Sequence, residues 1–319
     1  MGRAAWNLID TLAPWTAFPL ERSIPEIRAK IKGEYLQTPT MTMPPRDRVV
    51  LVTGAARGLG WGIARAFGLA GARVCVTDIR DDELARCARD LAADGTDFQA
   101  VRSDVADLAE CKSVVKKIVD RWGRLDVVVQ NAIYMPLVTF DATTPEEWSR
   151  QIDVGIGGLF NCTYAAWNQM KAQRGGHIIG IASGSSIRGY KQEIAYCTIK
   201  HGIEGFVQAL SLEARPHNIA LNTIGPGARI KPTRMTWAEY DHAPEELRAN
   251  WADPVELGKA WVWLAAQPPG RFSGYRFDAA PLVATIAREG RDFEFAVEKV
   301  TLYPDDFRAR QEWYSNYKE

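Results

Sequence analysis

The sequence is poor in the side chains that bind metals and form disulfides. It contains four histidines and five cysteines in 319 residues, and no Cys-x-x-Cys pair. The spacing of these side chains matches no metal-ligand motif, so we predict no metal site. An odd number of scattered thiols differs from a disulfide framework and indicates a reducing, cytoplasmic compartment.

The chain also lacks an excess of charge and a long apolar run. Lys plus Arg and Asp plus Glu number 39 each, for a formal net charge of zero. This balance favours neither nucleic acid nor an anionic membrane as a partner. No apolar run has the length of a membrane span, and the first residues lack the apolar core of a signal peptide. We therefore expect a soluble, cytoplasmic, globular protein.

A glycine-rich turn follows a short apolar run near residue 50. Residues 49–52 read VVLV, and a helix is expected from Leu59. The glycines let the backbone turn sharply and approach a ligand. The helix then directs its unpaired N–H groups and positive dipole end toward the position of a pyrophosphate. We predict a dinucleotide site whose first residues are Thr53, Gly54, Arg57, Gly58, Leu59 and Gly60.

An acidic residue, Asp78, ends the next apolar run at 73–77. A carboxylate there accepts hydrogen bonds from both hydroxyls of an adenosine ribose and repels a 2′-phosphate, which favours NAD over NADP. Arg57 and Arg80 are basic and favour NADP. The alternative to a ribose contact is that Asp78 caps the helix that follows, although Asp81 is the more natural N-cap of that helix.

Strand-like and helix-like segments alternate from residue 48 onward. Strands are expected at 48–53, 73–78, 98–102, 126–130, 177–182, 219–224 and 275–278. Helices are expected at 59–70, 82–93, 107–122, 153–172, 195–214 and 254–266. This alternation predicts an α/β fold with right-handed crossovers: a doubly wound parallel sheet of about seven strands, with helices on both faces.

Two segments fall outside this alternation. Residues 1–45 are too apolar for a disordered tail, and we expect a docked N-terminal arm. Residues 280–319 are rich in aromatic side chains, and we expect a C-terminal extension that serves as a lid or a subunit contact. The dinucleotide-binding catalytic domain then spans 46–279.

A serine, a tyrosine and a lysine follow the fifth expected strand. Ser183 ends that strand, and Tyr196 and Lys200 lie four residues apart, on one face of a helix. A nearby cation favours phenolate and lowers a tyrosine pKa from about 10. Such a phenol exchanges a proton with an alcohol or carbonyl oxygen, which Ser183 could hold. A Tyr-x-x-x-Lys pair alone is common by chance, with Tyr in a core and Lys on a solvated face.

Together these motifs resemble the short-chain dehydrogenase/reductase family, whose members are Rossmann-fold NAD(P)-dependent oxidoreductases. TGAARGLG at 53–60 resembles the family's glycine turn, and Ser183, Tyr196 and Lys200 resemble its catalytic residues. The resemblance spans about 48–279. It implies further cofactor contacts from Asp104, Val105, Asn131, Ala132, Tyr196, Lys200, Pro226, Gly227 and Thr233.

Three positions depart from the family pattern. Gly155 stands where the family has an Asn that positions a water beside the catalytic Lys, so another group or a water is expected there. Ile133 replaces the glycine of the family's Asn-Ala-Gly segment. The segment after Gly227, ARIKPTRMT, carries extra residues before Thr233.

The resemblance implies interconversion of a secondary alcohol and a ketone, on a small-molecule substrate, by a homodimer or homotetramer. Apolar residues of the expected pocket favour a bulky cyclic or aromatic substrate: Met135, Leu137, Trp237, Tyr240 and Trp251. Basic residues in loops near the expected pocket keep a carboxylate or a phosphorylated compound as an alternative substrate. The alternatives are a non-catalytic NAD-binding sensor or assembly subunit, which Gly155 favours, and a cofactor-independent lyase or dehalogenase, which the glycine turn disfavours.

Overall fold

The computed structural model describes residue 46 and residues 48–290. The expected N-terminal arm, residues 1–45, and the aromatic tail from residue 291 lie outside the described residues. No helix within the described ranges combines the length and the apolar character needed to cross a membrane.

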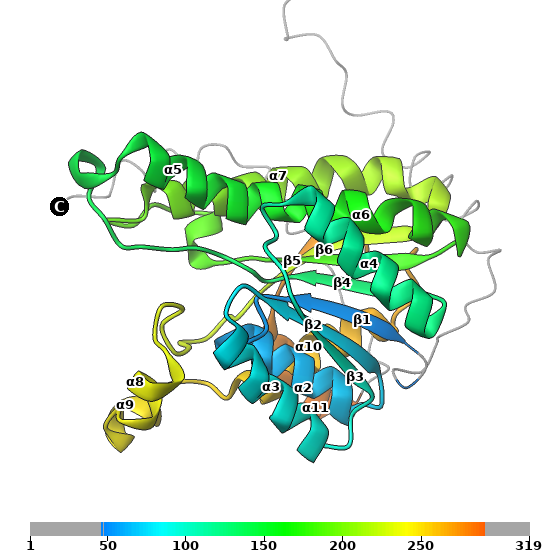
Figure 1. Cartoon of the computed structure of the whole chain (residues 1–319), viewed down its shortest axis with the longest axis horizontal. Helices are drawn as coiled ribbons and strands as arrows, with labels where there is room; N and C mark the ends of the chain where they lie inside the picture. The colour runs from blue at the N-terminus through cyan, green and yellow to red at the C-terminus, as the bar shows by residue number, and fades with distance from the viewer. Residues whose placement is uncertain (1–45, 47, 291–319) are drawn as a thin grey trace, which may run out of the picture. The chain divides into compact units, whose positions relative to one another are not determined.

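A seven-stranded parallel sheet forms the centre of the structure (Figure 1). Its strand order is β3-β2-β1-β4-β5-β6-β7, so the chain winds outward in both directions from the β1–β4 pair. This confirms the predicted doubly wound fold. The strands are β1 (Val49–Thr53), β2 (Arg73–Asp78), β3 (Phe98–Arg102), β4 (Val127–Gln130), β5 (Gly176–Ile181), β6 (Ile219–Gly225) and β7 (Tyr275–Asp278).

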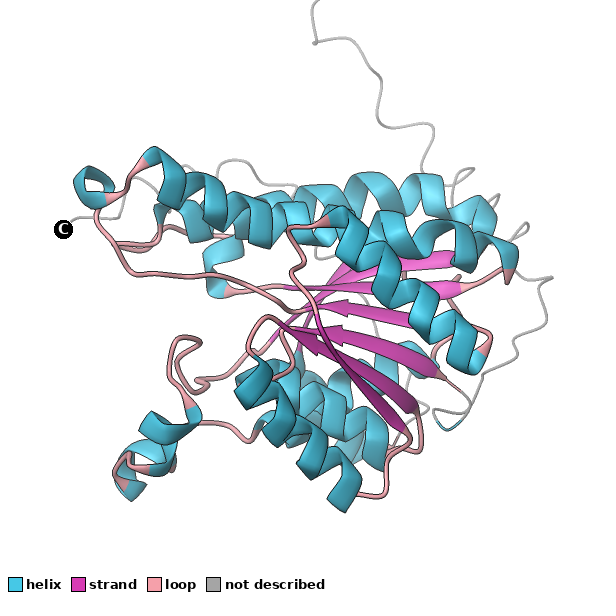
Figure 2. Ribbon diagram, in the orientation of Figure 1, coloured by secondary structure: helices cyan, strands magenta, loops and turns pink. Residues whose placement is uncertain are grey.

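Helices cover both faces of the sheet (Figure 2). One layer contains α4 (Leu108–Trp122), α5 (Pro145–Ile152), α6 (Gly158–Ala172) and α7 (Ile194–Ala214). The other contains α2 (Gly58–Leu69), α3 (Asp81–Ala93), α10 (Pro254–Ala266) and α11 (Ala279–Glu289). Two short helices, α8 (Trp237–Asp241) and α9 (Glu245–Arg248), lie beyond the carboxyl ends of the strands.

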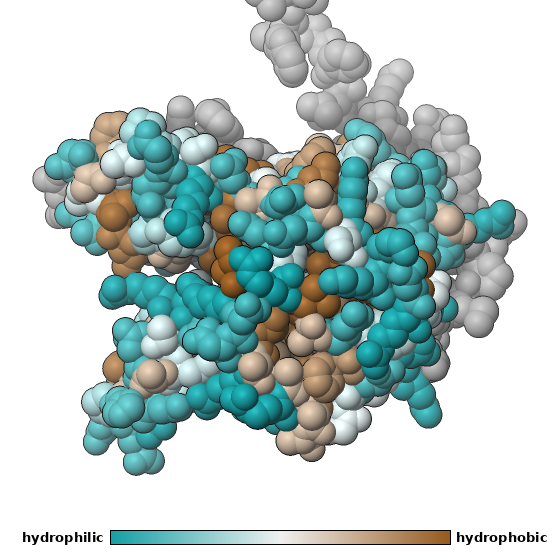
Figure 3. Space-filling view, in the orientation of Figure 1, coloured by the Kyte–Doolittle hydropathy of each residue, from teal (hydrophilic) through white to brown (hydrophobic). Residues whose placement is uncertain are grey.

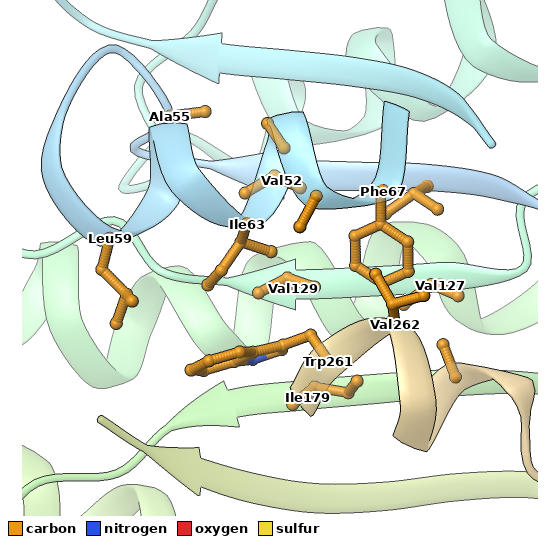
Figure 4. Close-up of a cluster of buried hydrophobic side chains, with 14 of the residues drawn as sticks. Val52, Ala55, Leu59, Ile63, Phe67, Val127, Val129, Ile179, Trp261 and Val262 are labelled. Atoms are coloured by element: carbon orange, nitrogen blue, oxygen red, sulfur yellow. The ribbon is translucent and has the colours of Figure 1, made fainter. Parts of the chain in front are cut away.

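The central strands read as continuous apolar runs because helices bury both of their faces. All five residues of β1 are buried, and alternate side chains enter different cores. Figure 4 shows the core on the α2 and α10 side, where Trp261 and Phe67 are fully buried. Val52, Val129 and Ile179 meet them from three neighbouring strands. Residues of β1 and α2 thus share one core on either side of the glycine turn.

Two expected elements differ from the structure. The expected helix at 153–172 begins earlier, as α5, and passes through a π-helical turn at Asp153–Gly157 before α6. The start of the expected C-terminal extension is the helix α11, which packs Leu282 into the core beside α10. One face of α11 therefore packs against the core, through Leu282 and its partly buried neighbours Val283 and Ile286.

His177, at the amino end of β5, provides a test of the buried core. Its side chain is 1% exposed, and burial, followed by repulsion from Arg48, lowers its pKa to about 3. The unfolded chain takes up a proton near pH 6.5 that the folded protein does not. The unfolded state therefore binds more protons below that pH, and stability falls as the pH falls.

We predict that His177→Gln removes this acid sensitivity. Between pH 7 and pH 5, the free energy of unfolding of the wild type should fall by about 2 kcal/mol more than that of the variant. Urea unfolding at a series of pH values measures both curves. Parallel curves would show that His177 is protonated in the folded protein.

Candidate active site

A cavity of about 1160 Å³ opens at the carboxyl edge of the sheet. Parallel α/β sheets bind ligands at this edge, where the strand order reverses. In the space-filling view a notch on the same side separates the segment carrying α5 from the one carrying α8 and α9 (Figure 3). The predicted site residues that line the cavity are Gly54, Arg57, Gly58, Leu59, Asp78, Asp104, Val105, Asn131, Ala132, Ser183, Tyr196, Lys200, Pro226, Gly227 and Thr233.

Asn131 joins the end of β4 to the glycine turn. Its side-chain amide donates to the carbonyls of Thr53 and Gly54 at 3.0 and 2.8 Å. The Thr53 hydroxyl accepts from the backbone N–H groups of Asn131 and Ala132, both at 3.1 Å. Thr53 itself is 2% exposed and Gly60 lies directly under the Asn131 amide. These two predicted cofactor residues therefore shape the turn.

The glycine turn leaves open space for a ligand at Gly58. This residue has a φ of +59°, which favours glycine, and a Cβ built on it would meet only the Lys231 Cε, at 4.0 Å. The residue before α2, Arg57, has an extended backbone and forms no side-chain cap. The first N–H groups of α2 therefore remain available to an anion, and the turn fits a dinucleotide diphosphate.

Asp78 is held at the end of β2 by the backbone. Its carboxylate accepts from the N–H of Ala56, in the glycine turn, at 3.2 Å and from the N–H of Arg80 at 3.1 Å. The helix α3 begins at Asp81 and its N-cap is Arg80. The alternative role of Asp78 or Asp81 as the N-cap is therefore wrong. Asp78 lines the cavity with a carboxylate whose position is fixed.

The two basic residues near Asp78 are paired with a residue that the sequence analysis did not identify. Glu83 lies 3.1 Å from the Arg57 guanidinium and 3.9 Å from that of Arg80. Their charges are thus partly balanced within the protein. The signal was present in the sequence, because Arg80 and Glu83 lie three residues apart at the start of α3.

Asp104 and Val105 follow β3 and line the cavity. The Asp104 carboxylate accepts from the N–H of Ala106 at 2.9 Å, which holds a tight turn. The Val105 carbonyl accepts from the Asn161 amide of α6 at 2.9 Å. This turn therefore has a fixed position relative to the sheet edge.

Ser183 begins a single 3-10 turn directly after β5. Its hydroxyl accepts from the N–H of Ser185, and the Ser186 hydroxyl accepts from the N–H of Ser183. Ser185 and Ser186 are buried, and Ser185 donates to Glu193 at 2.8 Å. These two serines support Ser183, because both bond to it and both are held in the buried turn.

Lys200 is a buried ammonium group at the base of the cavity, 3% exposed. It donates to the Ile181 carbonyl at the end of β5, at 2.7 Å. Burial lowers its pKa to about 8, while the carboxylate of Glu204, one helical turn away, raises it. An ammonium has three donors, so two remain for a ligand.

A second cation, the partly buried Arg276 of β7, completes this network. Its guanidinium donates to the Ser183 carbonyl at 3.0 Å and pairs with Glu204 at 3.1 Å. Glu204 also accepts from the Thr223 hydroxyl at 2.7 Å. Sequence analysis missed both charged residues, although Glu204 lies four positions after Lys200 on the same helix face.

Tyr196 keeps partial exposure to the cavity, one helical turn before Lys200. The Lys200 ammonium lies 5.3 Å from the centroid of its ring. Burial raises the Tyr196 pKa to about 12, whereas a hydrogen bond with Ser183 lowers it. The predicted lowering of this pKa by Lys200 is therefore wrong for the protein alone, because loss of hydration outweighs the other effects.

Gly155 has no room for a side chain. A Cβ at this position would lie 2.6 Å from the Cγ2 atom of Ile199, which is buried beside Lys200. The Asn expected from the family pattern is excluded because Ile199 fills its place. The π-helical turn at Asp153–Gly157 brings this backbone against α7.

We predict that Gly155→Ala lowers the free energy of unfolding by about 1–3 kcal/mol, because the added methyl group overpacks against Ile199. Gly157→Ala in the same turn is the matched control, since its nearest contact would be an ordinary 3.4 Å. Urea unfolding measures both. The clash should be absent when Ile199 is also replaced by Ala. If Gly155→Ala lowered the free energy of unfolding equally in the wild type and in Ile199→Ala, this packing would be contradicted.

The loop after β6 borders the other side of the cavity. Pro226, Gly227 and Thr233 line it, and Thr233 is exposed. Asn222 is fully buried and instead joins β6 to β7, accepting from the N–H of Tyr275 at 3.0 Å. Ile133 lines the cavity and packs on the core, so it replaces glycine without obstructing the turn.

The residues expected to form an apolar substrate pocket divide into two groups. Met135 and Leu137 line the cavity. Trp237, Tyr240 and Trp251 lie outside its lining and pack on one another, with ring centroids 5.8 and 5.9 Å apart. Apart from Tyr196, the aromatic side chains that do line the cavity are Tyr134 and Tyr190, which the sequence analysis did not name.

No group of three or more His, Cys, Asp or Glu side chains in the part of the chain that the structure describes is arranged to hold a metal ion. All five cysteines are free thiols.

The parallel sheet and the glycine turn after β1 define an NAD(P)-binding Rossmann fold. The family model for short chain dehydrogenase matches residues 48–243. The protein is thus a member of the short-chain dehydrogenase/reductase family of oxidoreductases.

Three similar proteins illustrate the range of the family. Galactitol 2-dehydrogenase of Agrobacterium fabrum is 37% identical over 219 residues, 67% of this chain and 84% of that protein. Trans-4-hydroxycyclohexanecarboxylate dehydrogenase of Sinomonas cyclohexanicum is 34% identical over 58% of this chain and 74% of its own. A metagenomic short-chain oxidoreductase, solved in complex with NADP, has a TM-score of 0.61 and 26% identity, over 72% of this chain and 96% of that one.

Proposed function

We propose that the protein is an NAD-dependent oxidoreductase that interconverts a secondary alcohol and a ketone. The observation that carries the proposal is the convergence of Ser183, Tyr196 and Lys200 on one cavity with the glycine turn. The names of the galactitol and hydroxycyclohexanecarboxylate dehydrogenases support a secondary alcohol as substrate. A bound nicotinamide supplies or accepts the hydride at the substrate carbon.

The proton moves at the substrate oxygen, and Tyr196 is the group placed to carry it. In alcohol oxidation the tyrosine oxygen takes the hydroxyl proton as the hydride leaves carbon; in ketone reduction it returns that proton to the oxygen. Ser183 donates a hydrogen bond to the same oxygen. Lys200, fixed by Ile181, places a positive charge beside the tyrosine and keeps donors free for the nicotinamide ribose.

Asp78 supports NAD over NADP. Its carboxylate is fixed at the strand end, where a 2′-phosphate would meet a like charge. Glu83 supports the same choice, because it engages both nearby arginines. We further propose a cytoplasmic homodimer or homotetramer acting on a small molecule, with a catalytic domain that extends through α11.

A non-catalytic NAD-binding subunit is the second candidate, and Gly155 favours it. In that case the hydroxyl of Tyr196 would have no chemical task. The two candidates therefore differ in turnover and agree in cofactor binding.

We predict that Tyr196→Phe lowers kcat by about 10²–10⁴-fold, because the proton carrier is lost. Oxidation of galactitol and trans-4-hydroxycyclohexanecarboxylate, followed by NADH absorbance, measures it, and the dissociation constant for NADH should stay unchanged. Tyr240→Phe, outside the cavity, is the matched control. Unchanged turnover in Tyr196→Phe would contradict the mechanism, and NADH binding without turnover in the wild type across an alcohol panel would favour the binding subunit.

We predict that Glu83→Gln shifts cofactor preference toward NADPH. Arg57 and Arg80 would lose their carboxylate partner and become available to a 2′-phosphate. The ratio of NADPH to NADH affinity, measured by fluorescence titration, should rise by about tenfold. Asp82→Asn removes a charge from the same helical turn and is the control. An unchanged ratio in Glu83→Gln would show that these arginines do not face the cofactor.

A further inference from the structure

Lys231 reaches over the glycine turn from the loop after β6. Its Cε lies 4.0 Å from the position of a Cβ on Gly58, and it lines the same cavity as the turn. Gly58 is where the backbone leaves room for a dinucleotide diphosphate. Two elements distant in the sequence thus place a cation beside the expected phosphates.

The ammonium of Lys231 is half-buried, and its surroundings balance its charge only in part. It donates to the Met235 carbonyl, and among the described residues it is in no ion pair. Burial, together with the charge of Arg57, lowers its pKa to about 8, whereas the charges of Glu83 and Glu239 raise it. Arg57, by contrast, is paired with Glu83 at 3.1 Å. A partly desolvated cation facing an open backbone turn is arranged for an anion.

The loop that carries Lys231 is anchored to the glycine turn. The indole N–H of Trp237 donates to the Ala56 carbonyl at 2.9 Å, and its ring packs on Trp61 with centroids 5.1 Å apart. The Arg86 guanidinium covers the same indole at 4.1 Å. The Lys231 ammonium lies 5.9 Å from the centroid of this anchored indole, so the loop that carries it needs little ordering to bind.

We propose that Lys231 is a ligand of the dinucleotide diphosphate. The loop after β6 supplies this ligand, and the N-terminus of α2 binds the diphosphate from the opposite side. This inference rests on the dinucleotide cofactor of the proposed function. The extra residues that follow Gly227 are then part of the cofactor site. Thr233, which the family pattern suggested for cofactor contact, lies two residues further along the same loop.

The test measures binding and requires no substrate. Calorimetric titrations with ADP, adenosine, NADH and NADPH compare the wild type with Lys231→Met. We expect the variant to bind ADP, NADH and NADPH about tenfold more weakly, and to bind adenosine as the wild type does. Lys231→Arg should recover most of the affinity. Arg229→Met, which removes the same charge from an exposed residue outside the cavity lining, should change none of these.

Three outcomes would overturn the assignment. Equal affinity of the wild type and Lys231→Met for ADP and NADH would remove Lys231 from the cofactor site while leaving the proposed function intact. A loss confined to NADPH would place the ammonium at the 2′-phosphate instead. Failure of the wild type itself to bind NADH, NADPH and ADP would reject both the inference and the proposed function. Unfolding midpoints of the ligand-free variants check that each is folded.

Discussion

The buried ammonium of Lys200 is the constraint that organises this site. Placing a cation out of water is costly unless hydrogen bonds and opposite charge compensate it. The Ile181 carbonyl supplies the hydrogen bond and Glu204 the charge. Glu204 in turn is held by Arg276 from β7 and Thr223 from β6. Three strands and one helix therefore fix a single charge, and Ser183 is attached to the same network through Arg276.

The sheet supplies the second constraint, because its strands end together at one edge. Asn131 at the end of β4 holds the turn after β1, and Asp78 at the end of β2 holds the same turn from the other side. The backbone around Gly58 is thereby fixed in an open conformation. The charged network and the open turn border one cavity, which places Tyr196 and Lys200 in the same space as the backbone around Gly58.

The elements that sequence could predict are those that depend on local pattern. The central strands are apolar because they are buried on both faces, and the glycine turn and the Tyr196–Lys200 spacing carry local signals. What sequence could not predict depends on contacts between distant elements. Arg276 meets Ser183 across 93 positions, and Ile199 fills the space at Gly155. The Tyr196 pKa was predicted wrongly because burial, which is the largest effect on it and raises it, is not visible in a four-residue spacing.

The central claim is that the carboxyl edge of the sheet binds NAD. Calorimetric titration of the purified wild-type protein with NADH and with NADPH tests it most directly. We expect NADH to bind with at least about tenfold higher affinity, because the fixed Asp78 carboxylate accepts ribose hydroxyls and repels a 2′-phosphate. Tighter binding of NADPH would contradict the role of Asp78. Binding of neither nucleotide would contradict the account of the whole edge.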